Sequence, residues 1–239
     1  MENEEGIERL FFDFAAESRL GILRELLRKN LRINEIARKL DLTATEAFRQ
    51  VQRLYESLLI QKLPDGSYSI SEYGKIAMQL LPSYEFIFKQ KAYFLDHDIW
   101  RLPKQFVERI GELSATTFVK DSIASISKIE QVMRRAEKFH WGIGEGQITE
   151  SMGLIATEQS NKGVKLRILS PFPPATQHNI ENRTLSPTPV FLVLTENEAV
   201  VCLRFTNGQM DYGGFYGEDA AFLSWARDLF LYYWNKERT

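Results

Sequence analysis

The sequence predicts an α+β protein built from two domains and a connector, and three patterns along the chain support that fold class. Residues 32–70 contain two short helical segments followed by a hairpin signal, which together indicate a winged helix-turn-helix domain over 1–75. Apolar and aromatic residues recur at helical spacing after it, so we expect a helical connector over 76–115 that could also form a dimer interface. Helical and strand-like segments then alternate, which indicates a mixed α/β domain over 116–239 with a sheet covered by helices.

Two helices are expected ahead of the helix-turn-helix. Residues Ile7 to Phe14 have a strongly apolar helical face, and Ser18 caps or begins a second helix that reaches Leu27. Three phenylalanines of the first helix either fill the core of the domain or form a seam between two copies: Phe11, Phe12 and Phe14.

The helix-turn-helix itself has a clear start signal for its second helix. A first helix over Ile33–Leu40 is followed by the short connection Asp41-Leu42. Thr43 stands at the cap position and Glu46 follows three residues later, which is the pattern of a capping box. Thr43 and Glu46 are therefore expected to fix the start of the helix that enters a DNA groove.

The second helix is predicted to have a core side and a DNA-reading side. Residues spaced by three and four are expected to pack on the domain: Ala47, Phe48, Val51, Leu54, Tyr55 and Leu58. The opposite side carries side chains that can reach phosphates or base edges in a major groove: Thr45, Glu46, Arg49, Gln50 and Arg53.

A hairpin is expected after this helix. Asp65-Gly66 supplies positive φ between the strand-like segments Ile60–Leu63 and Tyr68–Ile70. Lys62, Ser67 and Tyr68 should then lie near the tip, where the wing of such a domain contacts the DNA backbone or minor groove. Helix-turn-helix folds also serve as protein-interaction modules, so a protein-protein adaptor without operator binding is the alternative function.

Charge is unevenly placed along the chain. The whole protein carries a formal net charge of −2, which is not the usual mark of a nucleic-acid-binding protein. Residues 1–17 hold one basic residue against six acidic ones, whereas residues 18–62 hold ten basic residues against five acidic ones. The predicted reading domain is thus locally basic, and we expect moderate affinity for double-stranded DNA that falls with salt.

The second half alternates helices and strands. One long helix or two are expected over 72–98, interrupted at Pro82, and a loop rich in Pro, Asn and Thr is expected over 170–189. Further helices are expected over Ser122–Phe139, Ile148–Gln159 and Asp219–Lys236, and strands over Val164–Leu169, Val190–Thr195 and Ala199–Phe205. The last two strands are separated by three residues, which is short enough for an antiparallel hairpin.

Two segments of the chain resemble archaeal transcriptional regulators of the methanogenesis-regulator type: Glu17–Leu23 at the start of the winged helix, and Trp225–Trp234 near the end. Val164–Leu169, Val190–Phe205 and Asp211–Gly214 fit the same order, so the resemblance covers nearly the whole chain. In that family an ArsR-like winged helix precedes a C-terminal domain similar to the phospholipase-D fold. The resemblance implies DNA-binding transcription control, with the C-terminal domain sensing an effector or forming the dimer.

Catalysis of the phospholipase-D kind is not expected, because it needs a His nucleophile with a Lys two residues on. None of His97, His140 and His178 has that Lys. The segment Gly142–Gly146 lacks the Gly-Lys-Ser/Thr ending of a phosphate loop, so a turn and helix entry are expected there instead. No enzyme activity and no cofactor are therefore predicted.

Metal sensing is also not expected. The predicted reading helix contains no Cys or His, and His97, Asp98 and His140 lack the spacing of a closed site. The single cysteine, Cys202, lies in an apolar run and is expected to be a buried small hydrophobe.

A small-molecule site in the second domain is the remaining hypothesis. Arg167 and Arg204 lie in apolar strands, where a charge needs a partner or a cleft. The other candidate residues stand at the ends of elements: His140, Trp141, Tyr212 and Tyr216. We expect an anionic effector if these residues converge; the alternative is that both arginines point outward from alternating strands.

Composition favours an intracellular protein. The 239 residues are 44% hydrophobic, enough for two domains with proper cores. The first residues are acidic where a signal peptide would be basic, and no apolar run approaches the roughly 20 residues that span a bilayer. We therefore expect a cytoplasmic protein that does not bind membranes. Together with the winged helix, this favours a homodimer that binds double-stranded DNA.

Overall fold

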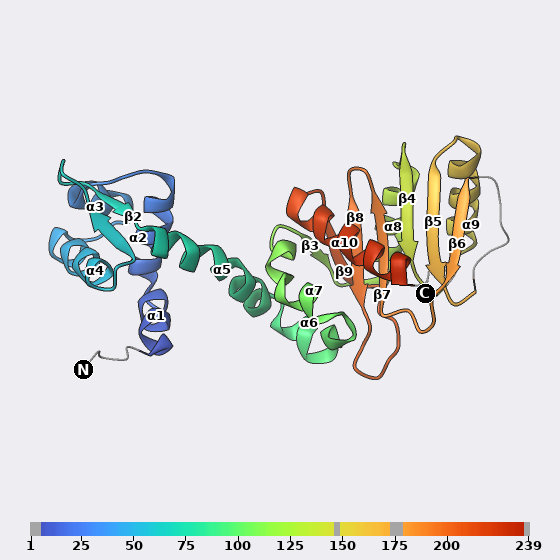
Figure 1. The fold of residues 1–239 in the computed structure, drawn as a ribbon, viewed down its shortest axis with the longest axis horizontal. Helices are drawn as coiled ribbons and strands as arrows, with labels where there is room; N and C mark the ends of the chain where they lie inside the picture. The colour runs from blue at the N-terminus through green and yellow to red at the C-terminus, as the bar shows by residue number, and fades with distance from the viewer. Residues whose placement is uncertain (1–5, 146–148, 173–178, 237–239) are drawn as a thin grey trace. The chain divides into compact units, whose positions relative to one another are not determined.

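The computed structural model describes residues 6–145, 149–172 and 179–236 (Figure 1). The chain divides into two compact units, residues 1–81 and 82–239. The first unit consists of helices and one small hairpin, and the second contains a seven-stranded sheet with helices on it. The predicted α+β fold class is confirmed.

The first unit is a winged helix-turn-helix, as predicted. Its helices are α1 (Ile7–Phe14), α2 (Glu17–Arg28), α3 (Ile33–Lys39) and α4 (Ala44–Glu56), and its hairpin consists of β1 (Ile60–Lys62) and β2 (Tyr68–Ile70). Helix α2 begins one residue before Ser18, with Ala16 at the cap position. Asp41 has a φ of 52° in the connection between α3 and α4, which gives the tight turn of the motif.

The wing closes at Gly66, whose φ is 82°. A residue with a Cβ would be strained in this conformation, so glycine suits the turn. The backbone N–H of Leu63 donates to the Ser67 carbonyl at 2.8 Å, and Lys62 pairs with Tyr68 across the hairpin. Leu31 forms an additional bridge with Tyr68, which attaches the wing to the segment before α3.

Helix α5 (Glu72–Lys89) begins in the first unit and ends in the second. The predicted interruption at Pro82 is wrong, because the helix continues through this residue. The helix gives up the one backbone hydrogen bond that proline cannot donate.

The second unit has the following elements: α6 (Lys91–Asp96), η1 (Ile99–Arg101), α7 (Lys104–Glu108), η2 (Ile110–Leu113), β3 (Thr117–Val119), α8 (Ser122–Arg134), β4 (Phe139–Ile143), α9 (Glu150–Asn161), β5 (Lys165–Ser170), β6 (Ile180–Thr184), β7 (Val190–Thr195), β8 (Ala199–Leu203), β9 (Gly214–Gly217) and α10 (Ala220–Lys236). The strand order is β3-β9-β8-β7-β4-β5-β6. Strands β4, β5 and β6 are parallel to one another, and the remaining neighbours are antiparallel.

The predicted hairpin of β7 and β8 is confirmed, with Val190 opposite Leu203 and Leu194 opposite Ala199. Strands β3, β6 and β9 were not expected from the sequence. The turn expected from Gly142 onward is also wrong at its start, because β4 extends through Gly142 and Ile143. Strand β6 lies in the segment interpreted as a Pro-, Asn- and Thr-rich loop, and it joins the sheet through its pairing with β5.

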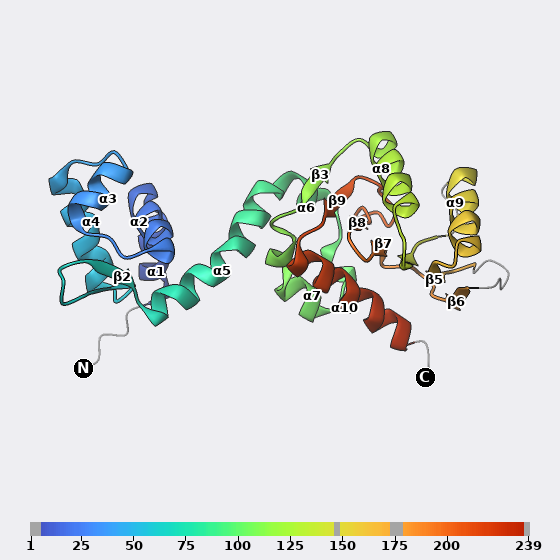
Figure 2. The same ribbon diagram turned by 90° about the horizontal axis from the view of Figure 1, so that it is seen from above.

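Helices cover both faces of this sheet (Figure 2). Helices α8 and α9 lie on one face and α10 lies on the other. The core on the α10 side also contains aromatic side chains from the segment after residue 81, among them Phe86, Tyr93 and Phe106. Most of the segment interpreted as a connector therefore packs within the second unit rather than between two domains.

None of the helices in the described ranges combines the length and the hydropathy that a membrane span needs.

Candidate DNA-binding surface and effector cavity

Helix α4 begins directly after the predicted cap residue Thr43, and one of the two hydrogen bonds of the predicted capping box is present among the described contacts. The Thr43 hydroxyl accepts a hydrogen bond from the Glu46 backbone N–H at 3.1 Å, so these two residues fix the first turn of the helix. This cap satisfies a backbone donor that would otherwise lack a partner. Thr43 itself is exposed, whereas Glu46 is half-buried.

The core-facing side of α4 is narrower than expected. Ala47, Gln50, Val51 and Leu54 are buried. The assignment of three further residues to the core is wrong, because they are exposed: Phe48 at 56%, Tyr55 at 45% and Leu58 at 70%. The outward side of the helix consequently carries Thr45, Phe48, Arg49, Gln52 and Arg53.

Gln50 does not lie on the outward side. It is buried, and its Oε1 accepts a hydrogen bond from Arg19 Nη1 of α2 at 3.1 Å. The prediction that Gln50 contacts DNA is therefore contradicted by its burial, and the amide instead holds α4 against α2.

Arg53 is half exposed but already has partners. Its Nε lies 3.0 Å from Asp13 Oδ1, and its guanidinium lies 4.4 Å from the centre of the Phe12 ring. Asp13 is fully buried, and it also accepts a hydrogen bond from Ser57 at 2.5 Å and pairs with Arg19 at 3.3 Å. Arg53 thus joins α4 to α1, so a contact of its guanidinium with DNA would compete with that link.

The wing presents fewer side chains than the sequence suggested. Lys62 is exposed, as is the turn from Pro64 to Gly66. Ser67 and Tyr68 are buried, which contradicts their assignment as DNA contacts: the Ser67 hydroxyl donates to Asp65 at 2.7 Å, and Tyr68 belongs to the core of the unit. The cause is the alternation of side chains along β2, which turns Tyr68 inward.

The sequence interpretation missed three residues on this surface. Phe48 and Gln52 are exposed on α4, and Arg32 donates through Nη2 to the Asp65 carbonyl of the wing turn at 3.1 Å. The buried side of α4 contains Gln50 in place of Phe48. Had Gln50 been assigned to the core, the sequence would have predicted that Phe48 and Gln52 point outward. No signal in the sequence connects Arg32 to the wing, because the two are 33 positions apart.

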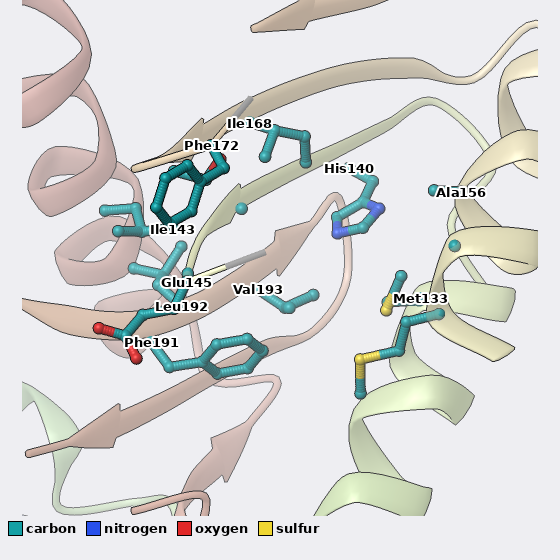
Figure 3. Close-up of a pocket in the computed structure, with 15 residues that line it drawn as sticks. Met133, His140, Ile143, Glu145, Ala156, Ile168, Phe172, Phe191, Leu192 and Val193 are labelled. Carbon is teal, nitrogen blue, oxygen red and sulfur yellow. The ribbon is translucent and has the colours of Figure 1, made fainter. Parts of the chain in front are cut away.

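The second unit contains a cavity of about 420 Å³ between the sheet and two helices (Figure 3). Strands β4, β5 and β7 contribute His140, Ile168, Phe191 and other lining residues, and α8 and α9 contribute residues such as Met133. This volume lies in the range of small-molecule sites. Figure 3 shows His140 pointing from β4 into the space in front of Met133 and Ala156.

Two polar atoms of the lining are buried without a hydrogen-bond partner among the described residues. They are His140 Nδ1 and Ser170 Oγ. Burial lowers the pKa of His140 to about 4, because desolvation disfavours the imidazolium. His140 is therefore neutral at pH 7, with one nitrogen able to donate and the other able to accept.

Of the six predicted ligand residues, only His140 lines the cavity. Trp141 faces the opposite side of the sheet, where its ring stacks on Phe230 with centroids 5.0 Å apart. Arg167 lies on that side as well, 5.4 Å from the Trp141 and Trp234 ring centres, and pairs with Glu181 at 3.4 Å. These positions contradict the convergence that we expected, since neighbouring residues of a strand face opposite ways.

Arg204 is buried next to the cavity and fully engaged. Its Nε and Nη1 donate to the Thr188 and Gly208 carbonyls at 2.7 and 2.8 Å, and its Nη2 contacts the Thr188 hydroxyl and the Glu145 carboxylate. Glu145 lines the cavity. The buried charge is thus compensated within the protein, and the alternative that Arg204 points outward is also wrong.

The two predicted tyrosines lie outside the lining. Tyr212 packs its ring against that of the lining residue Phe191, with the ring centroids 5.5 Å apart. Tyr216 is buried on β9, where its hydroxyl donates to the Ser125 carbonyl at 3.0 Å. Burial raises the pKa of both tyrosines above the usual range, so both hydroxyls stay protonated.

Both ring nitrogens of His97 lie within hydrogen-bond distance of protein groups. His97 is buried, with Nδ1 2.7 Å from the Tyr93 carbonyl and Nε2 3.0 Å from Asp211. Asp98 caps the short helix η1 through the Trp100 N–H. In the described ranges no three His, Cys, Asp or Glu side chains are grouped so that they could hold a metal ion. His178 and Gly146 lie outside the described residues.

Comparison with known proteins gives one family match. Residues 174–236 match the model of the middle domain of the methanogenesis regulatory protein FilR1. No curated protein sequence matches the chain. The structure of TrmBL2, an archaeal chromatin protein described with a novel mode of DNA binding, aligns with 99% of this chain and 99% of its own at 15% identity and a TM-score of 0.43. A structure of PigF with SAH aligns with 77% of this chain and 66% of its own at 13% identity and a TM-score of 0.27.

Proposed function

We propose that this protein is a transcriptional regulator that binds double-stranded DNA through its winged helix-turn-helix. The observation that carries the proposal is the outward face of α4, where Thr45, Arg49 and Gln52 are exposed, and Lys62 of the wing is exposed as well. Arginine and glutamine are side chains that form bidentate hydrogen bonds to base edges in the major groove. The match of residues 174–236 to a domain of a methanogenesis regulatory protein supports a regulatory role.

The test is a mobility-shift assay with DNA selected by the wild-type protein from a pool of random duplexes. Arg49→Ala and Gln52→Ala should each weaken binding by about 1–3 kcal/mol and relax the preference at one base position. Arg28→Ala is the matched control, because Arg28 is 75% exposed on α2 and pairs with Glu25 of the same helix. Unchanged affinity of both α4 variants would contradict the placement of the reading face, and failure to select any DNA would contradict the proposed function.

We also propose that the regulator is a homodimer. Tyr73, Ile76 and Leu80 recur at spacings of three and four in α5, and they are 48%, 63% and 63% exposed. Such a row forms one apolar face of a helix. In a two-fold dimer the same patch of both copies meets, so this face can pack against the same face of a second copy. Dimers of this symmetry bind palindromic operators.

Analytical ultracentrifugation tests the dimer. Ile76→Glu and Leu80→Glu together should shift the sedimenting species from dimer to monomer, because each copy would bring two carboxylates into an apolar seam. Leu95→Glu is the control, because Leu95 is 79% exposed on α6, outside this face. A wild-type monomer at all protein concentrations would refute the proposal.

One observation favours the alternative function of a protein-protein adaptor. Phe48, Tyr55 and Leu58 are exposed at the flank and end of α4, and neighbouring exposed apolar residues are typical of protein contacts. Phe48→Ala separates the two functions. If the protein is a regulator, the Phe48→Ala variant should still bind DNA in a salt-dependent way, at a reduced level. If it is an adaptor, neither the wild type nor the variant should select any DNA sequence.

The cavity of the second unit is the proposed effector site of this regulator. Residues of α8, α9 and three strands of the sheet line the cavity, and His140 of the predicted set is among them. The anionic effector expected from the sequence depended on Arg167 and Arg204, whose charges are compensated by Glu181 and Glu145. The effector chemistry therefore has to be argued from the lining itself.

A further inference from the structure

We infer that the cavity between the sheet and helices α8 and α9 binds a neutral, mainly apolar small molecule, with His140 and Ser170 as its hydrogen-bonding contacts. The inference rests on the proposed effector role of the second unit and specifies the chemistry of the ligand. The binding site itself is inferred from the lining of the cavity, and ligand binding to it can be measured without DNA.

Most of the residues that line the cavity are apolar. Met133 of α8 and Met152 and Ala156 of α9 form the helical wall, and Phe191 and Val193 of β7 belong to the sheet wall. Methionine side chains adapt to ligands of different shape, because they are unbranched and polarizable. Apolar walls with a few polar groups are the usual composition of a small-molecule site.

Two glycines keep the sheet side of the cavity open. A Cβ at Gly142 would lie 3.2 Å from Ile168 Cδ1, and a Cβ at Gly144 would lie 3.1 Å from the Phe191 ring. Both glycines line the cavity. Larger residues at these positions would fill the space between β4 and its neighbours.

The polar atoms stand at two separate places along this space. His140 pairs with Leu166 of β5 in the sheet register, and Ser170 follows four residues further along the same strand. At about 3.3 Å per residue, the two backbone positions are on the order of 13 Å apart. An elongated ligand can therefore meet His140 toward one end and Ser170 toward the other.

Both polar atoms need a partner. His140 is 2% exposed and Ser170 is 0% exposed, and His140 Nδ1 and Ser170 Oγ have no hydrogen-bond partner in the described part of the chain. Leaving buried polar atoms unsatisfied costs free energy, which a ligand hydroxyl or carbonyl would recover. The His140 imidazole is neutral and the Ser170 hydroxyl is uncharged. Hydrogen bonds from these two groups therefore suit a neutral polar group of the ligand.

The charges near the cavity disfavour an anion. Among the described residues that line the cavity, the one carboxylate or cation is Glu145, whose carboxylate faces Arg204. Each donating nitrogen of Arg204 already contacts an oxygen of the protein. An anionic ligand would have to lose its water without gaining a free cation, which is unfavourable.

The test uses 1-octanol as the neutral probe, with octanoate and octylammonium as charged probes of the same chain length. Isothermal titration and thermal unfolding of the full chain should show saturable octanol binding and an octanol-dependent rise in Tm. Octanoate and octylammonium should bind at least tenfold more weakly. Octanoate binding as tightly as octanol would overturn the inferred chemistry, and no saturable octanol binding would overturn the site.

Two variants locate the probe. Ala156→Leu places a larger side chain in the cavity and should weaken octanol binding at least tenfold, whereas Ala124→Leu, at an exposed position of α8, should leave it unchanged. If Ala156→Leu does not fold by circular dichroism, Ser170→Ala tests the same site by removing one hydroxyl, with a smaller expected loss. Equal octanol binding by the cavity variant and the control would refute the location.

The effector role is tested separately by repeating the DNA mobility shift with octanol present. A changed DNA affinity in the wild type, absent in Ala156→Leu, supports both proposals. Octanol binding to the cavity without any change in DNA affinity would keep the site and contradict its effector role. Loss of DNA selection altogether would contradict the regulatory function while leaving the binding measurement intact.

Discussion

Replacing Asp13 by alanine should loosen the first unit, because this carboxylate connects three elements. It is fully buried, and its partners are Arg53 at 3.0 Å, Ser57 at 2.5 Å and Arg19 at 3.3 Å. Removing one member of a buried ion pair costs about 3–5 kcal/mol, since the other charge is left uncompensated. Arg19 has only 8% of its side chain exposed and carries most of this cost, whereas Arg53 is 45% exposed and contributes little.

We expect the lower end of that range, about 3 kcal/mol, because Arg19 keeps other acceptors after the substitution. Its Nη1 still donates to Gln50, and its Nε still donates to the Asp13 backbone carbonyl. Amide hydrogen exchange of the full chain should then show core amides of α2 and α4 opening about a hundredfold more readily. The four tryptophans all lie in the second unit and would not report this change.

Glu56→Ala is the matched control, because Glu56 is an exposed carboxylate of α4 that accepts one hydrogen bond from Gln52. Its effect should stay within about 0.5 kcal/mol. Combining Asp13→Ala with Arg19→Met should recover most of the lost stability, because no buried charge then remains unpaired. Exchange rates of Asp13→Ala equal to those of Glu56→Ala would refute the idea that the buried carboxylate holds α1, α2 and α4 together.

Lys62→Ala should reduce the slope of log affinity against log salt by about 0.9 for one lost phosphate contact, with the exposed neighbour Gln61→Ala as its control. Gly66→Ala should destabilise the wing by about 1–2 kcal/mol, because the φ of 82° strains any residue with a Cβ; unchanged exchange of the β1 and β2 amides would contradict this. For His140 the folded pKa of about 4 lies below the unfolded value, so the stability from its neutral form is complete above about pH 6.5 and falls as the pH drops toward 4. In urea unfolding, the free energy of unfolding of His140→Leu should depend less on pH between about 4 and 6.5 than that of the wild type. The same pH dependence in both proteins would show that the ring is hydrated in the folded state.

The winged helix could be predicted from sequence because its signals are local. Thr43 and Glu46 mark the start of α4, and Asp65-Gly66 marks the wing turn, all within a few residues of the elements they define. Strands β3, β6 and β9 carry no comparable signal. They have three, five and four residues, and they exist because a neighbouring strand pairs with them: β9 pairs with β3 and β8, and β6 with β5.

The cavity was harder to predict than helix α4, because the elements that cover each face of a strand, and the partner of a buried charge, lie far away in the sequence. His140 and Trp141 are adjacent, yet the sheet sends one into the cavity and the other against α10. Arg204 is a cation in an apolar strand region, and its carboxylate partner Glu145 lies 59 positions away. A buried arginine in a sequence therefore indicates a carboxylate elsewhere in the fold at least as strongly as it indicates an anionic ligand. The polar atoms that do point to a ligand are those of His140 and Ser170, which have no partner among the described residues.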